Sequence, residues 1–131
     1  MEQRKVNPWK WQNQYSFSQA IEVSGANNVL YCAGQTSVDS EGHPMHAGDM
    51  ARQVELALKN LDTVLQAAGF TLANVVRLNY YTTDVEKLLE AYEVVAKHLA
   101  DGSCQPSSTL LGVARLAFPE LMVEIEATAV K

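Results

Sequence analysis

The segment that decides the fold covers residues 49–69 and reads DMARQVELALKNLDTVLQAAG. Its apolar side chains recur at spacings of three and four, the period of an α-helix that buries one face. This stripe consists of Met50, Val54, Leu58, Leu61, Leu65 and Ala68. Asp49 is suited to cap the first turn, and Gly69 is suited to the left-handed conformation that often ends a helix. We therefore predict one amphipathic helix across this segment.

On both sides of this helix, the chain contains short apolar or alternating segments that are typical of β-strands. They cover residues 17–23, 29–33, 74–82, 108–116 and 121–130. The first two are separated by residues 24–28, SGANN, a polar stretch that contains a glycine. This spacing predicts a β-hairpin in which the segment 17–23 pairs with the segment 29–33.

A second helix is predicted after the third strand. Residues 83–86, TDVE, have the form of a capping box, apolar residues continue at helical spacing to Leu99, and residues 101–103, DGS, end the helix. The order ββαβαββ predicts an α+β two-layer sandwich with both helices on one face of a mixed or antiparallel sheet. We treat residues 1–131 as one domain whose N-terminal arm, 1–14, carries two tryptophans.

The composition indicates a globular chain of 131 residues, 47% of them hydrophobic. Ten Lys and Arg against 15 Asp and Glu give a net charge of −5, which disfavours nucleic-acid binding because phosphate backbones are repelled. Two cysteines are too few for a disulfide framework, and the N-terminus lacks an apolar signal region, so we expect a cytoplasmic protein. No apolar run approaches the ~18 residues of a membrane span.

The last predicted strand carries apolar residues on both of its faces. Leu121, Val123, Ile125, Ala127 and Ala129 alternate on one side, and Met122 and Val130 lie on the other. A two-layer monomer leaves one face of its sheet in water. We therefore expect a second copy of the chain to cover that face, and we predict a homo-oligomer.

Candidate chemical groups are few. His43 and His46 lie in a turn-rich loop, and because a metal site needs three or four ligands, a solvated loop is favoured over a metal site. The sequence contains no phosphate-binding glycine motif and no nucleophile elbow. Glu124 and Glu126 share one face of the last strand, roughly 7 Å apart. Two interpretations stay open: a solvated outer face, or a carboxylate placed at a pocket to orient water or exchange a proton.

Several short motifs together resemble the RidA/YjgF family of reactive intermediate deaminases, often labelled endoribonuclease L-PSP. They follow the family's order and spacing from about residue 15 to the end of the chain. These motifs are FSQA at 17–20, AGQ at 33–35, the helix up to AG at 68–69, VVR at 75–77, TTD at 82–84 and VEIEA at 123–127. The resemblance implies a chorismate-mutase-like fold, a homotrimer with clefts between its subunits, and hydrolysis of enamines and imines such as 2-aminoacrylate without a cofactor.

The same resemblance implies a role for individual residues. Glu124 matches a glutamate that positions the attacking water, and Gly34 would offer a backbone contact in the cleft. Phe17 stands where the family usually has a tyrosine. Ser108 replaces the arginine that binds the substrate carboxylate, and Tyr92 replaces an asparagine.

The serine changes the ligand that we expect. Loss of a charge-assisted pair costs about 1.5–3 kcal/mol, which weakens carboxylate binding by roughly one to two orders of magnitude. Arg115 would lie on the opposite face of the same predicted strand, about 23 Å away, and the place of Arg77 stays open. We expect a trimer that binds a small neutral or cationic molecule, with imine or enamine hydrolysis as its candidate activity. The alternative is a non-catalytic ligand-binding or chaperone-like trimer, and the acidic charge argues against an endoribonuclease.

Overall fold

The computed structural model describes all residues, 1–131. In chain order its elements are β1 (Glu2–Val6), η1 (Trp11–Tyr15), β2 (Ala20–Ser24), β3 (Val29–Gln35), α1 (Met50–Ala67), η2 (Leu72–Asn74), β4 (Val75–Thr82), α2 (Val85–Glu90), α3 (Tyr92–Asp101), β5 (Ser107–Gly112) and β6 (Val123–Val130). Here η1 and η2 are short 3₁₀ helices. None of the helices is both long enough and apolar enough to cross a membrane.

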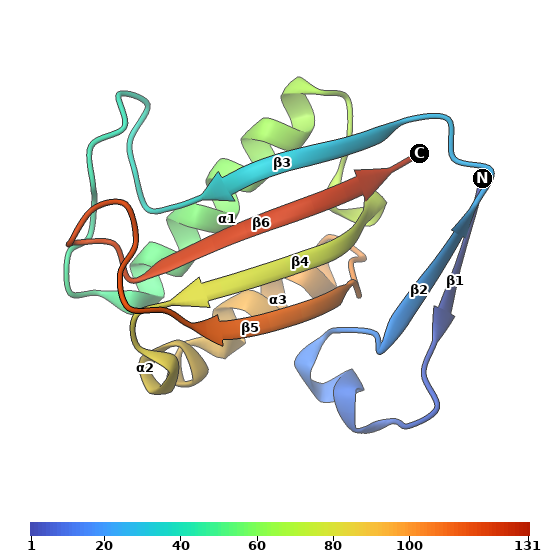
Figure 1. Ribbon diagram of the computed structural model, residues 1–131, viewed down its shortest axis with the longest axis horizontal. Coiled ribbons are helices and arrows are strands. Elements are labelled where there is room, and N and C mark those ends of the chain that lie inside the picture. Colours follow the sequence, from blue (N-terminus) through green and yellow to red (C-terminus); the bar gives the residue numbers. More distant parts are fainter.

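A four-stranded sheet forms one layer of the fold, with the strand order β3-β6-β4-β5. β6 pairs antiparallel with β3 and with β4, whereas β4 and β5 run parallel. The α-helices lie together behind this sheet in Figure 1 and cover one of its faces. The predicted α+β sandwich with a mixed sheet is confirmed.

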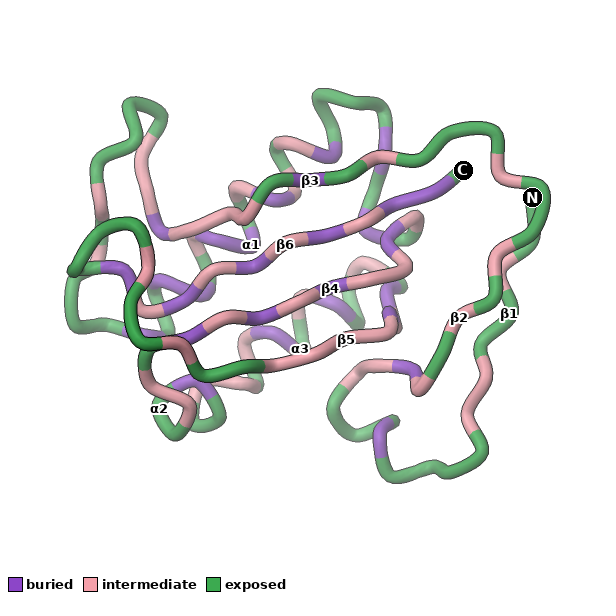
Figure 2. Tube along the Cα trace, viewed as in Figure 1, coloured by how far each residue is buried: buried purple, intermediate pink, exposed green.

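The core lies between α1 and the sheet, and it includes the predicted stripe. Val54, Leu58, Leu61 and Leu65 are almost completely buried, as the burial colours of Figure 2 show for this side of α1. The Asp49 carboxylate accepts a hydrogen bond from the Arg52 amide at 3.1 Å, so the predicted cap is present. These interactions fix α1 against β3 and β6, the strands that carry part of the candidate site.

The predicted hairpin between segments 17–23 and 29–33 is wrong. β2 begins at Ala20 and pairs antiparallel with β1, whereas β3 pairs with β6 alone. The cause lies just before β2, where Ser18 is attached to the strand at the opposite side of the sheet. Its amide donates to Pro106 O at 2.8 Å and its hydroxyl donates to Gln105 O at 2.6 Å. β2 therefore starts beside β5, and the turn residues 24–28 join it to β3 without forming a hairpin.

Two further predictions need correction. The second helix is interrupted at Ala91, which ends α2 and begins α3. β5 ends at Gly112 rather than at residue 116, so Arg115 lies outside the strand and the expected distance along it does not apply. The arm, residues 1–14, contains β1 and most of η1.

Candidate functional site

An aromatic pocket of about 450 Å³ lies where β5, α2, α3 and the segment after η1 meet. Its lining residues are Tyr15, Phe17, Tyr80, Leu89, Tyr92, Ser108 and Leu110. Three of these residues, Phe17, Tyr92 and Ser108, were expected at the site from the sequence. No charged side chain lines this pocket, so its character is apolar with a few hydroxyl groups.

The register of the sheet directs Ser108 into the aromatic pocket. Ser108 is opposite Leu78 and Leu110 is opposite Tyr80 in the parallel β4–β5 pair. Because Leu78 and Tyr80 are buried on the helix side of β4, their partners on β5 face the same side. Ser108 therefore presents its hydroxyl to the space between the sheet edge and the helices.

The aromatic rings are held by hydrogen bonds from neighbouring elements. The Tyr92 hydroxyl donates to Tyr15 O at 3.0 Å, and the two rings meet edge to face with centroids 6.2 Å apart. Gln105 Nε2 donates to Phe17 O at 3.1 Å, which fixes the backbone at Phe17. Tyr80 packs on Tyr92, again at 6.2 Å between centroids. The rings thus form one wall of the pocket.

The Tyr80 hydroxyl is buried and has no hydrogen-bond partner. Burial raises the pKa of Tyr80 well above its usual value, so the phenol stays neutral and keeps its proton. Leaving a buried hydroxyl unpaired costs free energy. Because Tyr80 lines the aromatic pocket, we expect its hydroxyl to donate a hydrogen bond to a molecule bound there. The alternation within residues 74–82 did not identify Tyr80 as a site residue, because alternation alone cannot distinguish a core tyrosine from a pocket tyrosine.

Gly34 and Glu124 form a second group, on the other face of the sheet. Glu124 is opposite Tyr81, the neighbour of Tyr80 that points away from the helices. A Cβ atom placed on Gly34 would lie 2.5 Å from both the Cδ and the Oε2 atoms of Glu124. The carboxylate thus lies directly over the Gly34 backbone. Within one chain, neither residue lines the aromatic pocket.

Glu124 and Glu126 differ in their hydrogen bonds, although their spacing places both on the same face of β6. Glu126 Oε1 accepts hydrogen bonds from the Tyr81 hydroxyl and, at 3.1 Å, from Asn79 Nδ2. These bonds, first the one from Tyr81 and then the one from Asn79, lower the pKa of Glu126. The Glu124 carboxylate forms no hydrogen bond to protein and no salt bridge. Glu126 is therefore a structural group, and Glu124 is the carboxylate that is free to act on a ligand or on water.

Other candidate groups lie away from this site. Arg77 donates to Thr109 Oγ1 at 2.7 Å on the open face of the sheet, and neither it nor Arg115 lines the aromatic pocket. His43 Nδ1 lies 3.2 Å from Asp39 Oδ2 at the surface. No group of three or more His, Cys, Asp or Glu side chains is placed to hold a metal ion.

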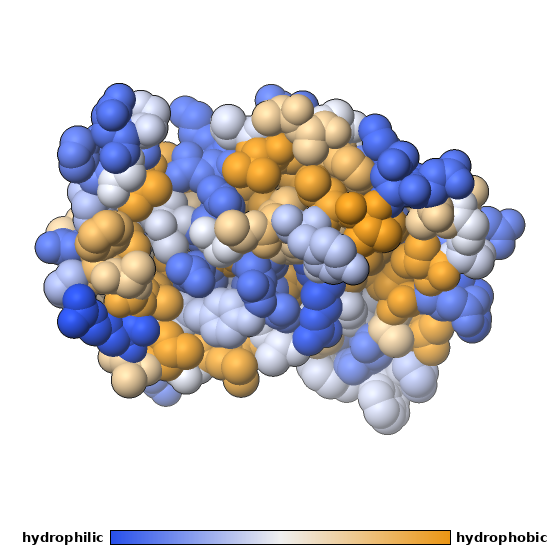
Figure 3. All heavy atoms as spheres, turned by 45° about the horizontal axis from the view of Figure 1, so that its top comes forward, coloured by the Kyte–Doolittle hydropathy of each residue, from blue (hydrophilic) through white to orange (hydrophobic).

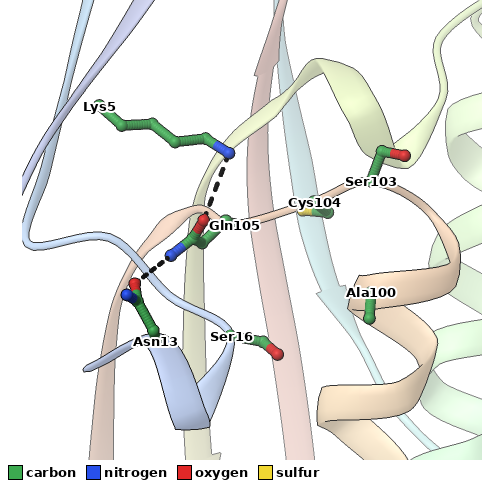
Figure 4. A pocket seen from close by; sticks show the side chains of 7 residues that line it. All are labelled: Lys5, Asn13, Ser16, Ala100, Ser103, Cys104 and Gln105. Atoms are coloured by element: carbon green, nitrogen blue, oxygen red, sulfur yellow. Dashed lines mark hydrogen bonds between the residues drawn. The ribbon is translucent and has the colours of Figure 1, made fainter. Parts of the chain in front are cut away.

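A second, polar pocket of about 420 Å³ separates the N-terminal segment from α3. Figure 4 shows Gln105 in its centre, bonded to Lys5 Nζ at 3.4 Å and to Asn13 Oδ1 at 3.0 Å. Cys104 lies at its base, and burial raises the pKa of this thiol to about 12. The polar groups around this pocket form hydrogen bonds across the two segments. These bonds attach the N-terminal residues to the body of the protein.

Comparison with known proteins decides the family. The model of the family described as endoribonuclease L-PSP matches residues 10–131. The chain belongs to this family. A relative named RutC family protein, from Aquifex aeolicus, is 35% identical over 115 residues, which is 88% of each chain. The match confirms the resemblance to the Rid family that the sequence motifs carried.

Two solved structures extend this comparison to three dimensions. YyfB from Yersinia pestis, described as a conserved Rid family protein of unknown function, is 32% identical and superposes with a TM-score of 0.90 over 100% of both chains. TdcF from E. coli, solved with bound serine, is 25% identical with a TM-score of 0.71, covering 88% of this chain and 87% of its own. The agreement with YyfB includes the N-terminal elements, since it spans the whole chain.

Proposed function

We propose that this Rid family protein hydrolyses a small imine or enamine to a carbonyl compound and ammonia, in clefts between the subunits of a homotrimer. The observation that carries the proposal is the unpaired Glu124 carboxylate lying over Gly34. The serine bound to TdcF supports a ligand of the size of an amino acid. The free, buried thiols Cys32 and Cys104 are compatible with the cytoplasm, where we place the protein.

Glu124 acts on water in the proposed reaction. Its carboxylate accepts a proton as the water oxygen attacks the imine carbon, and the electron pair of the C=N bond moves to nitrogen, which takes up a proton. The resulting carbinolamine loses ammonia as the C=O bond forms. One imine and one water thus give one carbonyl compound and one ammonia, with no oxidant or reductant.

The aromatic pocket determines which imines are accepted. Phe17, Tyr92 and Ser108 contribute one ring or hydroxyl each, and no cation is present to pair with a carboxylate. Burying an unpaired carboxylate there would be costly. We therefore expect imines without a carboxylate to react in preference to 2-imino acids. In this proposal Ser108 replaces a carboxylate-binding arginine and sets the preference.

A second candidate function is ligand binding without turnover. It is favoured by the neutral lining of the aromatic pocket, which could retain a small apolar molecule without any acid or base. RNA cleavage, which the family's label suggests, is disfavoured by the net charge of −5. These alternatives separate cleanly in experiment because only hydrolysis requires Glu124.

The test compares Glu124→Gln with Glu126→Gln, a matched control on the same strand. Imines are generated in situ by an amine oxidase, and their loss is followed by semicarbazide trapping and by ammonia release. We expect Glu124→Gln to lower turnover by at least a hundredfold and to leave ligand binding within a fewfold, whereas Glu126→Gln keeps most of the activity. Binding without turnover in the wild-type protein would instead support the second candidate.

A further inference from the structure

The N-terminal part of the molecule leaves two strand edges without a partner. β1 and β2 form a separate two-stranded sheet, which we call the N-terminal ribbon, and β2 has no other neighbour. β3 is an outer strand of the main sheet with only β6 beside it. Figure 1 shows the ribbon beyond the right-hand ends of the strands, where it runs from near the start of β3 down to the level of β5 and does not lie along the β3 edge. Each copy of the chain therefore carries one unpaired strand edge of each kind.

The N-terminal ribbon lacks the packing that such a structure normally needs. An isolated two-stranded hairpin is at best marginally stable in water. Apart from their contacts with each other, β1 and β2 make few contacts with other elements, and Lys5 supplies one hydrogen bond to Gln105. A third strand along the free edge of β2 would supply the missing hydrogen bonds and apolar cover.

The β3 edge is equally incomplete. On the open face of this outer strand, Tyr31 is 80% exposed and Val29 is 52% exposed, which is unusual for large apolar side chains of a central sheet. Figure 3, which turns the β3 side of the molecule forward, shows hydrophobic atoms gathered in the upper middle of this view, between hydrophilic atoms on either side. An uncovered apolar edge strand is a template for pairing with another strand.

The chain's own β2 cannot reach its own β3 in this structure. Ser18, two residues before β2, is bonded through its amide and its hydroxyl to the residues that lead into β5. Tyr15 and Phe17 are held there as well, by Tyr92 and by Gln105. Because β3 and β5 are the two outer strands of the sheet, pairing within one chain would require all of these bonds to break.

We propose that the N-terminal ribbon is exchanged between copies of this chain, so that β2 of one copy pairs antiparallel with β3 of the next. The turn-like residues 24–28 support this partner, because the sequence pattern on either side of them specifies β2 against β3. The match to YyfB over the whole chain supports the open position of the ribbon. A second copy is the occupant that carries this complementary strand by construction.

The hydrophobic pattern fixes the register of this pairing. With Val23 opposite Leu30 and Ile21 opposite Cys32, apolar residues of β2 join the side of β3 that packs toward α1. In this register Glu22 lies opposite Tyr31 on the open face. A slip by one residue would instead place Glu22 on the side that packs toward α1. The pairing leaves β1 as the new outer strand, and its charged residues protect that edge.

The exchange is head to tail, so it forms a ring when the rotation between copies closes. Each copy donates one ribbon and accepts one, and a closed ring leaves no β2 or β3 edge unpaired. The homotrimer of the proposed function would satisfy this condition with three exchanges. An open chain of copies would grow into filaments instead.

The exchange also joins the two halves of the candidate site. Antiparallel pairing brings the start of β2 beside the end of β3, so Phe17 and the aromatic pocket approach the partner subunit's Gly34 and the partner subunit's Glu124. This consequence rests on the proposed function, whereas the strand exchange itself does not. The exchange therefore explains why the aromatic pocket and the Gly34–Glu124 pair lie apart within one chain.

Disulfide trapping tests the exchange directly. In the double variant Glu22→Cys/Tyr31→Cys, the Cα atoms of positions 22 and 31 in the two paired copies are expected roughly 4.5–5.5 Å apart. This separation is within the reach of a disulfide. After mild oxidation, a non-reducing denaturing gel should show covalent dimers and trimers that reduction dissolves. The matched control is Glu22→Cys/Leu111→Cys, which moves the second thiol to the exposed end of β5 and should remain monomeric. A monomer with an internal disulfide, or no disulfide at all, would overturn the exchange.

Hydrogen exchange on the unmodified protein gives a second measurement that does not depend on the variants. In the assembled protein, β3 amides that do not bond to β6 should exchange at least a hundredfold more slowly than exposed loop amides. Rapid exchange along this edge would contradict the proposal. Imine turnover of the wild-type protein is measured beside the trapping, so that disulfides without turnover reject the proposed function alone, and turnover without disulfides rejects the exchange alone.

Discussion

The carboxylate of Glu124 lies over the backbone of Gly34, so close that a methyl group on Gly34 would be 2.5 Å from Glu124 Cδ and Oε2. Such a separation is far inside van der Waals contact, so only glycine leaves this position to the carboxylate. The backbone at Gly34 has no positive φ. The requirement for glycine is therefore one of space and not of backbone conformation.

Gly34→Ala should displace the Glu124 carboxylate without unfolding the sheet. We expect turnover to fall by at least tenfold, because a catalytic group moved by about 1 Å loses much of its effect. The change should add little in the Glu124→Gln background, where no carboxylate is left to misplace. Steady-state turnover of the four proteins of this cycle, with thermal unfolding as the control, measures both effects. Independent, multiplicative losses would show that Gly34 does not act through Glu124.

Ser108→Arg should introduce a carboxylate-binding cation into the aromatic pocket. A charge-assisted pair contributes about 1.5–3 kcal/mol, so turnover of imines that carry a carboxylate should rise roughly ten- to hundredfold. Ser107→Arg is the matched control. Ser107 is the neighbour of Ser108 but faces the other side of β5, and its hydroxyl donates to Val76 O at 2.8 Å. An equal effect of both substitutions would indicate general charge attraction rather than a specific anchor.

Tyr80→Phe should change stability and ligand binding in opposite directions. The substitution removes a buried hydroxyl that has no partner, so we expect the free energy of unfolding to stay level or to rise by about 1 kcal/mol. Affinity for the ligand of the aromatic pocket should fall roughly tenfold, because the donor is lost. Urea unfolding and ligand titration measure the two quantities. Unchanged affinity would mean that the Tyr80 hydroxyl does not contact the ligand.

Cys104 should make the protein less stable at alkaline pH. Burial raises the pKa of its thiol to about 12, whereas a thiol in the unfolded chain has a pKa of about 8.5. Above that pH the unfolded state loses the proton and the folded state keeps it, so stability falls by up to about 1.4 kcal/mol per pH unit until the folded thiol ionises. Urea unfolding of wild type and Cys104→Ala between pH 8 and 10.5 should show a steeper loss for wild type. Parallel curves would contradict the assignment.

Local signals in the sequence were sufficient for α1, because Asp49, Gly69 and the apolar stripe act within a few residues of one another. They were insufficient for the partner of β2 within one chain. That choice is made by bonds from Ser18 to Gln105 and Pro106, almost ninety residues away along the chain, which no local pattern records.

The site shows the same division. Spacing placed Glu124 and Glu126 on one face but could not rank them, because the hydrogen bond from Tyr81 to Glu126 depends on the β4–β6 register. The resemblance selected Phe17, Tyr92 and Ser108, and the sheet register brings them to one pocket. The resemblance could not reveal that, within one chain, Gly34 and Glu124 lie on the other face of the sheet.

The central claim is that a cleft in which Glu124 meets the uncharged aromatic pocket hydrolyses imines that lack a carboxylate. The most direct measurement compares two imines with the same phenyl group, one generated from phenethylamine by an amine oxidase and one from phenylalanine by an amino acid oxidase. The account predicts at least tenfold higher kcat/KM for the phenethylamine-derived imine, with the rates for both imines abolished in Glu124→Gln. Equal or greater turnover of the phenylalanine-derived imine, or turnover of neither imine, would contradict it.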